Sequence, residues 1–401
     1  MTLTEMETAV LDANYDMRLA RIAVDGARAG VMQADTRPNP VLSLNGASYS
    51  PSSGLGGGNV FGKRVDQIVR IEQTFERGNK RLLRIGLADA QLEGKRLDLQ
   101  EQRREVLQLV RDTWIDLLLT EQRIVVLDET RRSYEASLEA ATKRVRAGDL
   151  AAADLARLRV EVLRARTDAE AALADHRHAQ ISLASLLAAP GDAATLQTDG
   201  QWPDSMATNT QPASRDQADD VGSRPDVASA RLALSAASTA IELARSQRVR
   251  DITFGLQFER FPGFGGTGNT IGAGVSIPLF FGNDYGGDVA HALSDRDAAE
   301  QTAAKVRAAA LADVASARTD LEVAGNKIAT YAGGLLEAAR SAARSADFAF
   351  TRGGLGIMDL MDARRTLLAT RLDALNAQAD YARALAAVDA AQTRSARRPS
   401  Q

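Results

Sequence analysis

Apolar and polar residues alternate along two stretches of the chain. The alternation runs from Ile252 to Glu259 and again from Thr270 to Leu279, with the glycine-rich segment FPGFGGTGN between the two runs. This pattern predicts a β-hairpin with one apolar and one polar face. Its strands have about ten residues, close to the length that crosses a membrane when the strand is tilted.

Residues 41–76 show the same pattern earlier in the chain. One alternating run begins at Leu42, the other runs from Val69 to Glu76, and SPSSGLGGGN lies between them. The chain therefore carries four predicted strands of membrane-crossing type. The smallest bacterial outer-membrane barrels have about eight strands, and unpaired strand edges are not tolerated in lipid. If these strands span a membrane, several copies of the chain must share one barrel.

Long proline-free tracts flank both strand pairs. Leucine, valine and isoleucine recur there at three- and four-residue spacing, which predicts amphipathic helices. At 1.5 Å per residue, each of the two longest tracts is a helix of roughly 100 Å. Prolines and glycines bound the tracts. The predicted helices cover residues 5–36, 79–147, 149–190, 224–250, 283–350 and 354–391.

The two halves of the chain match each other. Gly148 and Asp154 correspond to Gly353 and Asp359 at the same offset. We expect a mainly α protein with membrane β structure, built as a duplicated helix–hairpin–helix unit. The first repeat is 1–223, with a helix, strand pair 41–76, long helix 79–147, return helix 149–190 and polar connector 191–223. The second repeat is 224–401, with a helix, strand pair 252–280, long helix 283–350, return helix 354–391 and a basic tail without fixed structure.

Composition narrows the possible functions. Hydrophobic residues make up 45% and aromatic residues 4% of the chain, which suits long, closely packed helices. The formal net charge of −3 predicts no nucleic-acid partner. No run of about 18 apolar residues is present, so we expect no transmembrane helix. No nucleophile–base pattern, HExxH or P-loop appears, so we expect neither an enzyme nor a cofactor.

The chain opens with MTLTEMETAV, and Thr2 and Glu5 have the spacing of a helix capping box. The opening residues lack the basic stretch and the following apolar stretch that a secretory leader contains. If the predicted strands span an outer membrane, the chain must be exported. We therefore expect that the sequence is a mature form or has a misassigned start.

The opening helix, the two hairpins, the glycine turns and the duplication together resemble the TolC-type outer-membrane factor family, the exit ducts of tripartite efflux and type I secretion systems. The resemblance implies a homotrimer, with four strands per chain in a 12-stranded β-barrel above a long α-helical periplasmic barrel. It also implies an outer-membrane location. The implied partners are a periplasmic adaptor (membrane fusion protein), an inner-membrane pump of the RND type and outer-membrane lipid.

The resemblance also implies particular site residues. Two glycine turns between helices would be the tips that contact the adaptor, at Ala147, Gly148, Asp149, Leu150, Gly353, Gly354 and Leu355. Aspartates beyond the tips would form an electronegative periplasmic gate, at Asp359, Asp362 and Asp154. Arg157 stands where a second aspartate would follow Asp154.

The segment Arg77-Gly78-Asn79-Lys80-Arg81 resembles the G-K-R segment of the heavy-metal cation efflux (CzcC-like) subfamily. The resemblance implies heavy-metal cations as exported cargo. Cations gather near the first hairpin, and we expect them to snorkel or line the lumen rather than form a specific anion site. These are Arg37, Lys63, Arg64, Arg70, Arg77, Lys80 and Arg81.

Two further motifs carry little chemistry. Residues 263–268 fit G-x-G-x-x-G, but a strand follows rather than a helix, so we expect a surface turn and not a dinucleotide site. His176, His178 and His291 are the only histidines and cysteine is absent, so we expect no metal site.

Two functions from different classes remain open at this point. One is a passive outer-membrane exit duct of a tripartite efflux system. The other is a soluble coiled-coil scaffold or periplasmic adaptor-like structural protein in which the strands form a small sheet. The apolar stripes of a duct stay exposed in the folded chain, whereas a scaffold covers them with its own helices.

Overall fold

The computed structural model describes residues 1–49, 51–52, 54–59, 62–202, 221–263 and 266–392. The chain divides into two compact units. The helical unit comprises Met1–Ile22, Leu97–Ala228 and Val306–Gln401, and the sheet unit comprises Ala23–Arg96 and Ser229–Lys305. Each unit takes segments from both predicted repeats. The division into repeats 1–223 and 224–401 stays a prediction.

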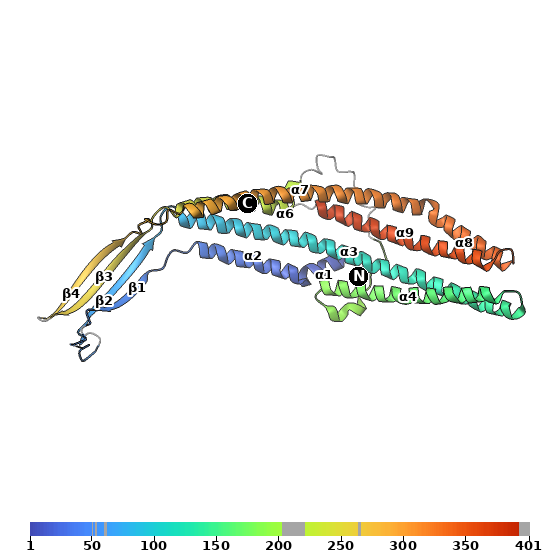
Figure 1. The fold of residues 1–401 in the computed structure, drawn as a ribbon, viewed down its shortest axis with the longest axis horizontal. Helices are drawn as coiled ribbons and strands as arrows, with labels where there is room; N and C mark the ends of the chain where they lie inside the picture. The colour runs from blue at the N-terminus through green and yellow to red at the C-terminus, as the bar shows by residue number, and fades with distance from the viewer. Residues whose placement is uncertain (50, 53, 60–61, 203–220, 264–265, 393–401) are drawn as a thin grey trace. The chain divides into compact units, whose positions relative to one another are not determined.

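The four predicted strands form one antiparallel sheet in the sheet unit (Figure 1). The strands are β1 (Val41–Ala47), β2 (Asp66–Phe75), β3 (Ile252–Gly263) and β4 (Gly266–Ser276). Their order in the sheet is β1-β2-β3-β4, so β1 and β4 are its edges. Of the predicted G-x-G-x-x-G turn, residues 264–265 lie outside the described residues.

The register places the apolar residues of all four strands on one face. One row across the sheet contains Leu42, Ile71, Leu256 and Ala273. The next row is equally apolar, with Leu44, Val69, Phe258 and Ile271. These side chains are not covered by the chain's own helices: Leu256 is 60% exposed and Ile271 is 83% exposed. An apolar face of this kind suits contact with lipid.

The opposite face of the sheet is polar. Arg70 forms an ion pair with Glu72 at 2.6 Å. A Cβ atom added at Gly255 would lie 3.3 Å from Nε of Arg70, so the arginine crosses the neighbouring strand where that strand has no side chain. Thr74 and Thr253 share a hydrogen bond of 2.9 Å on the same face. Two faces of opposite character are expected for a strand with lipid on one side and water on the other.

A tight connection joins β2 to the helix that follows it. Gly78 has φ +72°, and a Cβ atom there would lie 2.7 Å from Cβ of Val249, so both conformation and space require glycine. Asp251 accepts hydrogen bonds from the Arg77 amide at 2.9 Å and from Lys80 Nζ at 2.8 Å. Lys80 is 5% exposed. The segment resembling G-K-R thus ties the two predicted halves together before β3.

The predicted opening helix 5–36 is in fact two helices, α1 (Leu3–Ala13) and α2 (Tyr15–Ala34). Asn14 separates them with an extended backbone, and its side-chain oxygen accepts hydrogen bonds from the amides of Asp16 and Met17. Asparagine competes with helical hydrogen bonds in this way and caps the next helix. The capping box of Thr2 and Glu5 is confirmed.

The first long helix, α3 (Lys80–Ala147), has 68 residues and is followed by α4 (Ala152–Leu186). Two short 3₁₀ helices, η2 (Pro190–Thr195) and η3 (Val221–Ser223), lie in the predicted polar connector, of which residues 203–220 lie outside the described residues. After α6 (Pro225–Ser246) and the second strand pair come α7 (Gly286–Thr330), α8 (Leu336–Thr351) and α9 (Ile357–Gln392). The predicted tail 393–401 also lies outside the described residues.

The predicted continuous helix 283–350 is wrong at one point. A π turn at Tyr331–Leu335 separates α7 from α8, and Gly334 has φ +133°. The lack of proline predicted continuity, but two consecutive glycines allow a backbone conformation that no other residue adopts without strain.

The expectation of no transmembrane helix stays a prediction. By length and composition alone, α6 is apolar enough to cross a membrane. Much of this apolarity comes from alanine, and α6 also carries Asp226, Arg231, Glu242 and Arg245. Length and composition of one helix are weak support for a membrane span.

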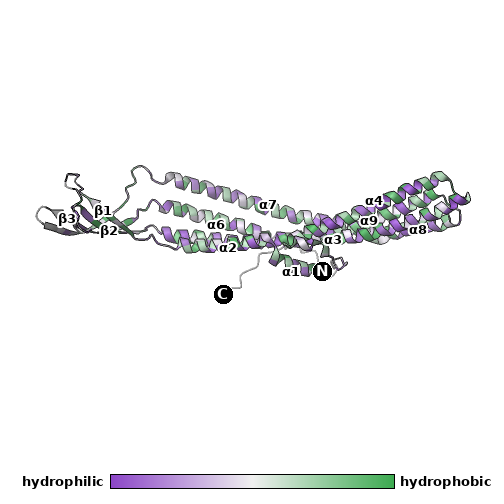
Figure 2. Cartoon of the chain, turned by 90° about the horizontal axis from the view of Figure 1, so that it is seen from below, coloured by the Kyte–Doolittle hydropathy of each residue, from purple (hydrophilic) through white to green (hydrophobic). Residues whose placement is uncertain are grey.

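The core of the helical unit has two kinds of packing. Large side chains gather where α1, α3 and α4 meet, including the fully buried Trp114, Leu118 and Leu183. Along α9, by contrast, alanines at seven positions between Ala377 and Ala391 are buried. Figure 2 shows polar and apolar residues intermixed along α4, α8 and α9. Small buried residues let helices approach closely, as the low aromatic content predicts.

Candidate functional site

The two predicted tips are alike in backbone geometry. After α3, Gly148 has φ +83°, and its amide bonds to the Val145 carbonyl at 3.1 Å while the Asp149 amide bonds to the Arg144 carbonyl at 2.9 Å. After α8, Gly353 has φ +77° and the same two bonds recur, from Gly353 to Phe350 at 3.0 Å and from Gly354 to Ala349 at 2.9 Å. Both are Schellman motifs, which end a helix on a left-handed glycine.

Both turns are exposed. Ala147, Gly148, Asp149, Gly353 and Gly354 are all solvent-accessible, and Leu150 and Leu355 are partly buried. No atom lies within 4 Å of a Cβ added at Gly148 or Gly353. The backbone conformation, and not crowding, therefore requires glycine at these positions. The open space around them is compatible with a partner surface.

The predicted gate aspartates lie on the first turns of the helices that follow the tips. Asp359 and Asp362 are exposed on α9, while Ile357, Leu360 and Met361 on the same turns are buried. Within the described part of the chain, neither carboxylate forms an ion pair. Asp154 differs, because it pairs with Arg157 at 3.5 Å. The helix periodicity thus places the two unpaired carboxylates together, facing solvent.

A compact apolar cluster holds the two helix pairs together behind the tips. It combines residues of α3, α4 and α9, among them Tyr134, Leu158, Val162 and Met361. The guanidinium of Arg144 lies 5.1 Å from the centroid of the Phe350 ring, which adds a cation–π contact between α3 and α8. The tip of one pair is therefore packed against the tip of the other.

Sequence reasoning missed a set of charged residues beside this cluster. Glu161 on α4 is 8% exposed and accepts two hydrogen bonds from Arg365 on α9, at 2.5 and 3.2 Å. The neighbouring Arg364 donates to Asp347 on α8 at 2.6 Å and to Ser137 on α3 at 2.7 Å. The sequence did contain one signal of this ion pair. Glu161 lies at helical spacing from Leu158 and Ala165, on the apolar face of α4 that is expected to be buried.

The environment of this charged set shifts the pKa values of Tyr134 and Arg365. Burial raises the pKa of Tyr134, and the negative charge of Glu161 raises it further. The hydrogen bond to Glu161 is the main cause of the raised pKa of Arg365. The Tyr134 hydroxyl is buried and has no hydrogen-bond partner within the described residues. The interface between α4 and α9 therefore contains an ion pair whose carboxylate is buried and whose guanidinium is partly exposed.

We expect Arg365→Met to destabilise the helical unit by about 1–2 kcal/mol, because Glu161 keeps its burial but loses its interhelical partner. The double variant Glu161→Leu/Arg365→Met removes both partners and should lose less. Thermal unfolding followed by circular dichroism in detergent measures the difference. Glu161 keeps only Arg164 of its own helix, at 3.2 Å, in the single variant. Equal or greater loss in the double variant would contradict the lost interhelical partner of Glu161 as the cause.

Within the described residues, no group of three or more His, Asp or Glu side chains is arranged to hold a metal ion. His176 contacts Thr120 at 3.3 Å, and the exposed His291 pairs with Asp295 at 2.8 Å. His176 and His291 thus each have a local partner.

A four-stranded sheet with an exposed apolar face, continued by long helices that end in paired glycine turns, defines a membrane channel protein of mixed β and α type. The chain belongs to the outer membrane efflux protein family, whose pattern it matches over residues 8–189 and 221–392. It is accordingly an outer-membrane efflux channel protein.

Known proteins with related sequences or folds agree with this assignment. The cobalt-zinc-cadmium resistance protein CzcC of Cupriavidus metallidurans is 25% identical over 378 residues, covering 93% of this chain and 85% of that protein. The structure of CusC, described in terms of transmembrane channel formation, has a TM-score of 0.81 at 18% identity and covers 98% of this chain and 92% of that chain. The outer membrane protein VceC of Vibrio cholerae has a TM-score of 0.78 at 17% identity, covering 97% of this chain and 95% of that chain.

The family decides between the two functions that the sequence left open. An outer-membrane efflux channel accounts for the exposed apolar face of the sheet, which a soluble scaffold would cover. The predicted TolC-type fold class and outer-membrane location are confirmed.

Proposed function

We propose that the chain is one protomer of a homotrimeric exit duct in a tripartite efflux system. The observation that carries this proposal is the sheet. Its apolar face is exposed, and in the described part of the chain β1 and β4 each pair on one side only. Three copies would supply a 12-stranded barrel and satisfy both edges, because β4 of one chain and β1 of the next run antiparallel.

We infer the protein partners from the glycine turns at the ends of the helices. The turns at Gly148 and Gly353 would contact a periplasmic adaptor, and the adaptor would connect the duct to an inner-membrane pump of the RND type. Both turns are exposed and share one backbone geometry, which supports two similar docking points. The pump would supply the energy, and the chain would act as a passive conduit rather than an enzyme, without a cofactor.

Heavy-metal cations are the cargo that we propose. The relationship to a cobalt-zinc-cadmium resistance protein supports this choice, as does the segment Arg77–Arg81. Asp359 and Asp362 would form the periplasmic gate, since three copies would gather six carboxylates at a water-filled constriction and favour cations. Asp154 would contribute less to the ring, because Arg157 offsets its charge.

Planar-bilayer recording tests the duct and its gate together. We expect the wild-type protein to form cation-preferring channels, and Asp359→Asn/Asp362→Asn to lower the cation-over-anion permeability ratio about two- to fivefold, because the local negative potential falls. The matched control Asp168→Asn/Asp175→Asn removes two exposed aspartates of α4 that lie away from the tip.

The control variant should keep the wild-type permeability ratio. Absence of any conductance from the wild-type protein would contradict the exit duct. Conductance with an unchanged ratio in Asp359→Asn/Asp362→Asn would contradict the gate while leaving the duct in place.

A further inference from the structure

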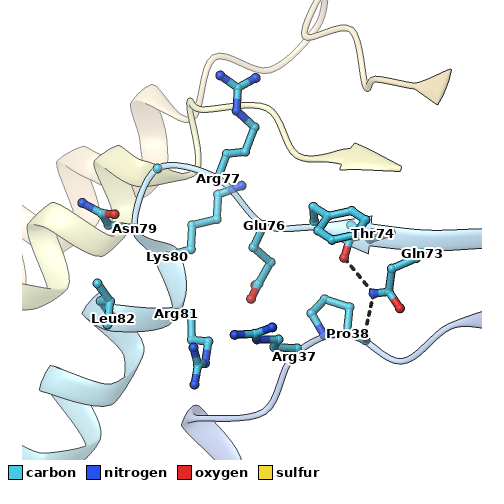
Figure 3. A pocket seen from close by; sticks show the side chains of 12 residues that line it. Arg37, Pro38, Gln73, Thr74, Glu76, Arg77, Asn79, Lys80, Arg81 and Leu82 are labelled. Carbon is cyan, nitrogen blue, oxygen red and sulfur yellow. Dashed lines mark hydrogen bonds between the residues drawn. The ribbon is translucent and has the colours of Figure 1, made fainter. Parts of the chain in front are cut away.

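A cationic cavity lies where the sheet meets the first turn of α3. It has a volume of about 540 Å³ and is lined by two chain segments, 37–38 and 73–82. Gln73 holds these segments together, since its side-chain amide donates to the carbonyl of Pro38 at 2.8 Å (Figure 3). Both segments belong to the sheet unit. The cavity is therefore built within one compact part of the chain.

Carboxylates near the cavity are already neutralised. Glu76 points into the cavity but accepts two hydrogen bonds from Arg84, at 2.5 and 2.9 Å. Asp251 pairs with Lys80 at 2.8 Å, and Asp35 pairs with Arg81. Each of the three anions thus holds one cation of its own.

Two arginines of the lining remain. Arg37 and Arg77 are exposed, and within the described part of the chain neither guanidinium has an ion pair or a hydrogen bond. In Figure 3 the Arg37 side chain lies on the same side as Arg81, whereas the Arg77 side chain starts from the opposite wall and extends away from the other labelled side chains. The five cations around the cavity face three carboxylates, so its rim carries two positive charges in excess. Such a rim favours an anion with several oxygen acceptors, above all a phosphate group.

An apolar groove adjoins the cationic cavity. It has a volume of about 450 Å³ and shares Gln73 and Phe75 with the cavity. The rest of its lining is almost entirely apolar: Pro40, Ile71, Phe254, Gly255, Leu256, Ala273, Gly274 and Val275. A ligand that filled both sites would combine an anionic head with a hydrocarbon chain.

The depth of the two sites agrees with this chemistry. The apolar rows of the sheet end at Phe75 and Ile252, and the cationic cavity begins directly beyond them. Lipid phosphates lie at this boundary between the hydrocarbon core and water. The inference therefore rests on the proposed function, in which the apolar face of the sheet contacts the bilayer.

We propose that the cavity binds the phosphate headgroup of an anionic phospholipid in the leaflet nearer the helices, with Arg37 and the exposed Arg77 as the cations that bind it. An acyl chain of the same lipid lies in the groove beside Phe75, Phe254 and Leu256. The bound lipid fixes the depth at which the sheet sits in the membrane. The cluster of cations near the first hairpin thus has a role more specific than snorkelling or lining the lumen.

Native mass spectrometry of the delipidated oligomer in detergent tests the site. Titration with phosphatidylglycerol, phosphatidylcholine and glycerol 3-phosphate compares an anionic lipid, a zwitterionic lipid and a free phosphate ester. Each cation near an anionic headgroup contributes roughly fivefold in affinity, so Arg37→Gln/Arg77→Gln should weaken phosphatidylglycerol binding about 25-fold. Arg37→Lys/Arg77→Lys keeps the charges and should retain most of the affinity.

The control Lys63→Gln/Arg64→Gln removes two cations from the loop between β1 and β2 and should bind phosphatidylglycerol as the wild type does. Equal binding by the wild type and Arg37→Gln/Arg77→Gln would overturn the inference, and so would an equal loss in the control. Full competition by glycerol 3-phosphate would assign the cavity to a free phosphate ester instead of a lipid. The oligomeric mass is read in the same spectra, so a monomeric wild type would contradict the proposed function, whereas an intact trimer with insensitive lipid binding would contradict only the lipid site.

Discussion

Leu256→Arg is expected to prevent insertion and assembly of the protein in the outer membrane. Leu256 lies in one of the two apolar rows that cross all four strands of the sheet, and it is 60% exposed. An arginine facing lipid at the middle of a membrane barrel costs about 2–4 kcal/mol. A trimer would contain three such substitutions, so the total cost is comparable to the stability of a typical domain. The amount of heat-modifiable oligomer in outer-membrane fractions measures the effect.

Thr270→Arg is the matched control for this prediction. It places the same side chain on the neighbouring strand but on the polar face, opposite Glu259. An opposite charge across the strands is favourable there. We expect normal levels of oligomer for Thr270→Arg and little or none for Leu256→Arg. Equal levels for the two variants would show that the two faces of the sheet do not face lipid and water as proposed.

Gly148→Lys/Gly353→Lys is expected to abolish crosslinking to the periplasmic adaptor while the trimer persists. Both glycines lie in exposed turns with open space around them. A lysine there adds bulk and charge at the proposed contact. It also adopts a left-handed backbone conformation, which costs an ordinary residue roughly 1–2 kcal/mol at each turn. Photo-crosslinking from the tip to the adaptor in cells measures docking, and the mass in detergent reports the trimer.

The variant Gly148→Asn/Gly353→Asn separates strain from contact. Asparagine tolerates the left-handed conformation better than other residues with a side chain. It carries no charge and is smaller than lysine. Crosslinking should be largely retained in the asparagine variant and lost in the lysine variant. Retained crosslinking in both variants would contradict docking at the tips.

The strands could be predicted from the sequence because the alternation of apolar and polar residues indicates both where a strand lies and which of its faces is apolar. Alternation at Leu42 and Leu256 predicted a membrane-facing stripe, and the register then aligned the two in one row. The tip glycines were predictable for a similar reason, since a left-handed helix end favours one residue type.

Other features depend on contacts that are distant in the sequence. Glu161 meets Arg365 across 204 residues, and neither position indicates its partner. The break at Asn14 depends on a side chain that can cap a helix or lie within one, and the break at Gly334 on a glycine pair that the absence of proline concealed. The cationic cavity was hidden for a related reason. The pairing of Lys80 with Asp251, and of Arg81 with Asp35, determines which cations remain available.

In the proposed assembly, each chain supplies four strands to a barrel that several chains share. Disulfide trapping between β1 and β4 tests it most directly, because the chain has no cysteine of its own. Ser43→Cys can be combined in turn with cysteine at Thr270, Gly272, Gly274 or Ser276, all on the polar face of β4. Within one chain, β1 and β4 are separated by three strand spacings, about 14 Å, which is beyond the reach of a disulfide.

Oxidation of at least one of these pairs should therefore give covalently linked trimers on denaturing gels, whereas Ser43→Cys alone should not. Chains that stay monomeric for every pair, in membranes where the protein is folded, would contradict a shared barrel.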